Sequence, residues 1–211
     1  MSRIKIGSVL HLLLWIVCFA GSSSANDWWP MVDGAEYVYV NAAEDTMVVS
    51  CEKVDSITYM LTYETATCSM SVKIYASGED VYQKGNSALC DDAGGGWYSY
   101  ESVTLLNGEP MFGRQWVEVR YMYAPGATYE MSVLISVGDA LEQVEVPAGV
   151  FDAVDIRTRA FTVDTFWGGT YSLAEGIGPV VIEPGGWKLV DYPGLVNGEE
   201  QSMSDLRRAF R

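Results

Sequence analysis

The sequence contains a single histidine, His11, which lies in an N-terminal segment that we expect to be removed. Without histidine a chain cannot build a Ser-His-Asp or Cys-His catalytic pair, nor a His-ligated zinc or copper site. It also has no side chain whose unperturbed pKa lies near neutrality. Since no other recognisable catalytic motif takes their place, we expect a protein that is not an enzyme.

Basic residues are also scarce. The chain has 13 Lys and Arg against 28 Asp and Glu, a formal net charge of −15. Loss of Arg3 and Lys5 with the N-terminal segment leaves 11 basic residues and a net charge of −17. Nucleic acids and anionic lipid surfaces are bound through clusters of Lys and Arg. The composition therefore argues against a nucleic-acid partner.

The N-terminal apolar run, residues 9–20, is too short to span a bilayer. It follows Arg3 and Lys5 and precedes the small residues of 21–25, an order typical of a cleavable signal peptide. An uncleaved anchor would need a longer run. We expect cleavage near Ala25 and an exported protein, periplasmic or extracellular, with no transmembrane segment in the mature chain.

Three cysteines, Cys51, Cys68 and Cys90, remain after this cleavage. In an oxidising compartment they indicate one disulfide and a spare thiol, and three pairings are open. We favour Cys51–Cys68, because these residues lie on apparently neighbouring strands. A metal cluster fits less well, since there are only three thiols and no CxxC motif.

Period-two alternation of apolar and polar residues recurs along the chain, and no segment has the pattern of a long helix. Turn signals rich in Gly, Pro and Asn, among them Gly168-Gly169, separate the runs. We predict ten to twelve strands in one antiparallel domain, residues 26–196, followed by a polar tail or short helix, residues 197–211. The predicted fold is an all-β antiparallel meander that curls into an open or closed β-barrel, with a β-sandwich as the alternative. A typical run is Val117, Val119, Tyr121 and Tyr123 on one face, opposite Glu118 and Arg120.

Three segments, 27–39, 144–154 and 171–181 with 189–192 after it, contain motifs that occur together in one group of proteins. They read DWWPMVDGAEYVY, VEVPAGVFDAV and YSLAEGIGPVV followed by LVDY. The chain thereby resembles uncharacterised bacterial exported β proteins of the DUF3108 and TapB-like type. The resemblance implies an exported β fold and no particular chemistry. Some members are lipoproteins, but Val17 stands before Cys18 where a lipoprotein signal needs a small residue.

The second and third motifs also make sense as hairpin geometry. Pro147 ends a strand because it cannot donate to the ladder. Gly149 can take the positive φ of a tight turn, and Phe151 restarts a core-facing row. Gly176 and Gly178 allow a sharp bend or a close backbone approach rather than phosphate binding, because no helix N-terminus follows them.

Aromatic residues offer a ligand-binding hypothesis. Trp28 and Trp29 lie near the mature N-terminus, and Trp97, Tyr98 and Tyr100 follow a Gly-rich loop. These residues are the best candidates for exposed rings that stack on sugar rings, and the alternative is that aromatic residues line an apolar cavity.

Acidic loop residues offer a metal hypothesis. Asp80, Asp91 and Asp92, with carbonyls of the Gly-rich loop, could supply oxygen ligands for calcium. No D-x-D-x-D-G loop is present, so solvated loop acids are the simpler interpretation.

These observations favour a non-enzymatic exported β-domain protein in a binding or envelope-accessory role, holding an apolar ligand or a partner segment. The alternative is a carbohydrate-binding or carbohydrate-active protein that uses exposed Trp and paired carboxylates. The expected partner is an apolar ligand, a glycan or an envelope protein, and calcium is the one cofactor considered.

Overall fold

The computed structural model describes residues 26–77, 80–90, 96–124, 126–161 and 166–193; the expected signal peptide and tail lie outside these ranges. Within them the chain forms fourteen strands, and no helix could cross a membrane. The strands are β1 (Glu36–Val40), β2 (Thr46–Lys53), β3 (Thr58–Glu64), β4 (Cys68–Ser77), β5 (Asp80–Cys90), β6 (Gly96–Tyr100), β7 (Val103–Leu106), β8 (Gln115–Ala124), β9 (Ala127–Val137), β10 (Glu142–Val146), β11 (Gly149–Phe161), β12 (Phe166–Ala174), β13 (Gly178–Glu183) and β14 (Trp187–Asp191).

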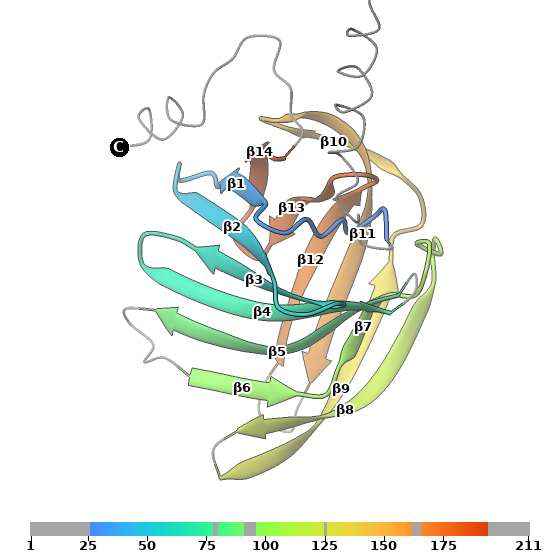
Figure 1. The fold of residues 1–211 in the computed structure, drawn as a ribbon. Helices are drawn as coiled ribbons and strands as arrows, with labels where there is room; N and C mark the ends of the chain where they lie inside the picture. The colour runs from blue at the N-terminus through green and yellow to red at the C-terminus, as the bar shows by residue number, and fades with distance from the viewer. Residues whose placement is uncertain (1–25, 78–79, 91–95, 125, 162–165, 194–211) are drawn as a thin grey trace, which may run out of the picture.

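Twelve of the strands form a nearly closed antiparallel barrel with one unsealed seam (Figure 1). The wall runs from β11 through β12, β13, β14 and β1 to β6, and then through β8 to β9, which pairs with β11. Two further strands lie beside this ring, because β7 pairs with β5 and β10 pairs with β11. The predicted all-β barrel is therefore confirmed, with more strands than the ten to twelve expected.

The interior of the barrel is filled by the apolar faces of its strands. Strands alternate buried and partly exposed residues, as β1 does with Tyr37 and Tyr39 buried. Ile135, Ile156 and Leu189 are completely buried. Each such side chain contributes about 1.5–3 kcal/mol by leaving water. A continuous hydrophobic core thus holds the wall together.

Gly168 and Gly169 do not form the predicted turn, because they lie inside β12. A side chain on Gly169 would place its Cβ 2.8 Å from the carbonyl oxygen of Glu183 on β13. That contact is closer than real side chains allow. The glycine pair is therefore a signal of close strand approach rather than of a bend.

The β10–β11 hairpin turns at Pro147 and Ala148, and Gly149 begins β11 with a φ of 144°. Phe151 is half-buried, and its ring packs edge-on against Tyr192 at 6.3 Å between centroids. Gly176 and Gly178, in and after the β12–β13 turn, have φ values of 74° and 96°.

The favoured Cys51–Cys68 pairing is wrong. Cys51 is a free, buried thiol on β2, opposite Leu61 of β3. Cys68 starts β4, so β3 lies between the strands that carry the two cysteines. In the backbone register the residue opposite Cys68 is Cys90 of β5.

Cys51 is expected to resist alkylation by iodoacetamide in the folded protein at pH 8 and to react after denaturation. Burial raises the pKa of the Cys51 thiol to about 11, so the nucleophilic thiolate is scarce at that pH. Mass spectrometry should show a label on Cys51 only under denaturing conditions. Rapid labelling of Cys51 in the folded protein would contradict its burial in the core.

Candidate functional site

The segment before β1, residues 26–35, runs across one end of the barrel (Figure 1). Its apolar side chains enter the core: Trp28, Trp29 and Met31 are 6%, 3% and 1% exposed. The expectation that Trp28 and Trp29 form an exposed stacking platform is therefore wrong. Their rings belong to the core, because the strands leave an apolar interior that this segment closes.

Hydrogen bonds fix this segment in place. The Asn26 side-chain oxygen accepts from the backbone N–H of Trp28 at 2.8 Å. The Trp28 indole N–H donates to a carboxylate oxygen of Glu109 at 2.8 Å. The Gly176 N–H donates to the Asp27 carbonyl at 2.7 Å. The segment is thus tied to the loops around the barrel mouth.

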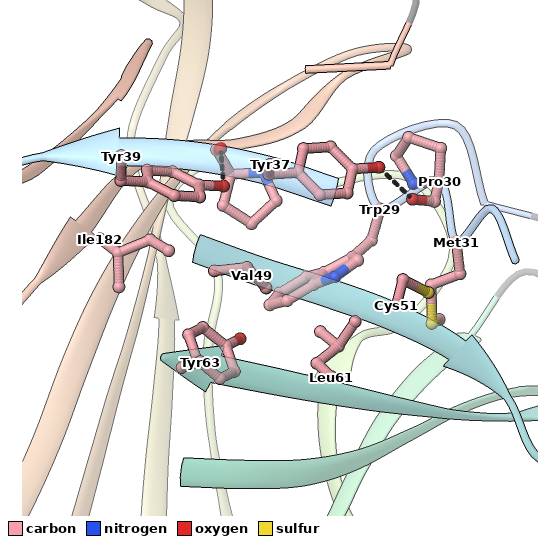
Figure 2. A pocket seen from close by; sticks show the side chains of 11 residues that line it. Trp29, Pro30, Met31, Tyr37, Tyr39, Val49, Cys51, Leu61, Tyr63 and Ile182 are labelled. Atoms are coloured by element: carbon pink, nitrogen blue, oxygen red, sulfur yellow. Dashed lines mark hydrogen bonds between the residues drawn. The ribbon is translucent and has the colours of Figure 1, made fainter. Parts of the chain in front are cut away.

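Behind the segment lies an aromatic pocket in which the Trp29 indole is central (Figure 2). Trp29 also meets Tyr171 edge-to-face, with ring centroids 5.1 Å apart. The remaining cavity is only about 20 Å³, room for about one water molecule. Its walls are Trp29, Pro30, Met31, Tyr37, Tyr39, Val49, Cys51, Leu61, Tyr63, Pro179 and Ile182.

Two tyrosine hydroxyls at this pocket act as hydrogen-bond donors. Tyr39 donates to the Pro179 carbonyl at 2.8 Å and Tyr37 to the Pro30 carbonyl at 3.3 Å (Figure 2). Burial raises the pKa of Tyr37 to about 12 and also raises the pKa of Tyr39. Both phenols therefore stay neutral at physiological pH. The Tyr37 bond positions the segment at Pro30, and the Tyr39 bond ties β1 to β13.

The second notable feature is the seam between β7 and β8. β8 pairs with β9 along its whole length, but with β6 only at Met122 and Tyr123. Beyond that point β8 faces β7, which pairs only with β5, and no β7–β8 backbone ladder occurs in the described residues. Two strand edges thus face each other across the wall without being paired.

Side chains of β8 bridge this seam. Glu118 accepts from the Thr104 N–H of β7 at 3.2 Å, and Arg120 Nε donates to the Ser102 carbonyl at 2.7 Å. Glu118 and Arg120 also form an ion pair at 3.1 Å, and the Trp116 indole N–H donates to Glu118 at 3.3 Å. The edge groups of β7 are therefore satisfied by charged side chains instead of by a neighbouring backbone.

The two faces of β8 are the reverse of the usual arrangement. Glu118 and Arg120 lie opposite the buried Val133 and Met131 of β9, so they face the barrel interior. Val117 is 63% exposed on the outer face, and the rest of that row, Val119, Tyr121 and Tyr123, is also exposed. The sequence row that typically indicates a core face here meets water.

The other predicted site residues do not gather at either feature. Trp97, Tyr98 and Tyr100 lie on β6, where only the backbone is described. Asp80 begins β5 and accepts a hydrogen bond from the Tyr82 hydroxyl at 3.0 Å. Asp91 and Asp92 lie outside the described residues, and within those residues no group of three potential metal ligands occurs.

The chain matches no protein-family model, no curated protein and no solved structure. The resemblance to DUF3108 and TapB-like proteins therefore stays an expectation based on its motifs.

Proposed function

We propose that the protein is a non-enzymatic, exported binding protein, in an envelope-accessory role, that holds an extended segment of a partner protein in the seam between β7 and β8. The observation that carries this proposal is the pair of facing strand edges, bridged by Glu118 and Arg120 rather than by backbone pairing. Unpaired strand edges are templates for an added strand.

The contacts at the seam support the same proposal. Here, past the Glu101–Tyr121 backbone bond, the contacts between the two edges are made by the side chains of Glu118 and Arg120 and not by a ladder of main-chain groups. A strand added between them would replace the side-chain bridges with main-chain hydrogen bonds and complete the wall.

The aromatic pocket fits the apolar-ligand alternative poorly. Small-molecule sites enclose about 300–1,000 Å³. The cavity behind Trp29 is about 20 Å³, because Trp29 and Met31 fill the space a ligand would need. Binding of a partner segment at the seam is therefore better supported than binding of an apolar ligand in the pocket.

The proposal can be tested with a displayed library of random ten-residue peptides selected on the purified protein. Selected peptides should protect the amides of Val117 and Val119 from hydrogen exchange. The Tyr121 carbonyl accepts from the Glu101 N–H, so amides of the same parity on β8 point into the seam.

A pair of variants separates this binding mode from others. Val117→Pro removes a seam-directed donor and should weaken peptide binding about tenfold or more. Val117→Lys keeps the N–H and should bind peptides as the parent does. Peptides that bind without protecting β8, or that tolerate Val117→Pro, would overturn the proposal.

A further inference from the structure

A strand added at the seam would lie in the plane of the wall and would leave the outer face of β8 in water. The apolar surface of that face, which we call the outer patch, therefore needs its own explanation. The patch consists of Val117, Val119 and Tyr121 of β8, Leu134 of β9 and Phe161 of β11. Four of these are exposed, by 63%, 52%, 43% and 43%, with Leu134 half-buried between them. Contiguous apolar surface of this kind marks interaction sites.

Strand register arranges the patch in rows. Val119, Ser132 and Phe161 lie side by side in the central row, because Ser132 is opposite both other residues. The next row on one side of the centre contains Val117 and Leu134, which lie opposite each other. Arg159 of β11 lies on the other side of Leu134 in the same row. The central row thus has exposed apolar residues on either side of the half-buried Ser132, and a cation lies at one end of the patch.

The other end of the patch carries an anion. Glu130 of β9 lies opposite Tyr121, one row beyond the centre in the other direction. Glu130 and Arg159 are both exposed, and neither has an ion-pair partner among the described residues. They are separated by about 14 Å along the strand direction, from four residues of rise.

We infer that the outer patch binds a second copy of this chain, forming a two-fold symmetric dimer. A two-fold contact requires that the same surface be complementary to itself. An axis in the plane of the contact, crossing the strands at the row of Val119 and Phe161, exchanges the two ends of the patch. It brings Arg159 of each copy beside Glu130 of the other, and Tyr121 over the second copy's Val117.

The opposite charges of Arg159 and Glu130 also favour a second copy of this chain as the partner. A net charge of −17 on each mature chain makes general association unfavourable, so a contact between copies needs a local cation. Arg159 supplies it at the end that meets Glu130 in the two-fold arrangement. An apolar patch without this pair of unpaired charges would not select a second copy.

Sedimentation velocity of the exported protein, purified from its own host, tests the dimer. The parent should be a dimer at micromolar concentration. Val119→Lys should be monomeric, whereas Val150→Lys, which changes a valine 61% exposed on β11 and outside the patch, should remain dimeric. A monomeric parent, or a dimer that tolerates Val119→Lys, would overturn the inference.

A charge exchange tests the geometry. Arg159→Glu and Glu130→Arg should each weaken the dimer about tenfold or more, because like charges then face each other. The double variant restores opposite charges and should recover the parent dissociation constant. Circular dichroism should show that all variants remain folded. Failure of the double variant to recover dimerisation, with both single variants impaired, would exclude the two-fold pairing.

Discussion

Replacement of Trp29 by alanine is expected to lower the free energy of unfolding by about 3–5 kcal/mol, the range for truncating a large buried aromatic side chain. Trp29 is 3% exposed, packs against Tyr171, and occupies the centre of the pocket behind the N-terminal segment. Its loss removes the largest group that fills this end of the barrel. Urea unfolding followed by circular dichroism would measure the change.

The cavity left by Trp29→Ala should bind indole. The space is lined by apolar and aromatic side chains, and an apolar cavity of that kind stays dry and accepts small aromatic molecules. Indole should therefore raise the melting temperature of the variant and not of the parent, by mass action on the folded state.

Val32→Ala supplies the control for this experiment, because Val32 belongs to the same segment but is 44% exposed. Val32→Ala should lower the free energy of unfolding by less than about 0.5 kcal/mol. If Trp29→Ala cost no more than Val32→Ala, the segment would not be part of the core.

The barrel was predictable from the sequence because its strands are short, alternate cleanly and are separated by turn signals. β11 shows this alternation, with Val154 and Ile156 buried and the charged Arg157 exposed. Which face of β8 lies inside the barrel was not predictable. Alternation separates two faces but does not say which is inside, and a polar face can be internal when its charges are paired and hydrogen-bonded.

The site residues were harder to predict than the fold. Trp28 and Trp29 were candidates for exposed stacking because they lie near the mature N-terminus, but they pack into the barrel that the later strands form. The signal for the seam was the charged pair Glu118 and Arg120 between exposed apolar residues. Its meaning depends on β7, which lies elsewhere in the sequence and leaves its edge unpaired, so local reasoning could not supply it.

Replacement of Glu118 by alanine should lower the free energy of unfolding by about 2–4 kcal/mol, more than replacement of any other charged residue. Glu118 accepts from Thr104 and Trp116 and pairs with Arg120, and its side chain is only 12% exposed. Its removal leaves these donors without their partner in a largely dry place. Urea unfolding would measure the loss, and hydrogen exchange should quicken at Thr104 before the rest of the barrel.

Two variants locate the cause of that loss. Glu118→Gln keeps one acceptor oxygen but removes the charge, so its free energy of unfolding should lie between those of the parent and Glu118→Ala. Glu142→Ala removes an exposed carboxylate from β10 and should change stability by less than about 0.5 kcal/mol. If Glu118→Ala were as mild as Glu142→Ala, the seam would be held by something other than this carboxylate. Because the same bridges must break for a strand to enter, Glu118→Ala should also bind seam peptides more tightly than the parent, which ties the stability of the wall to its capacity to bind.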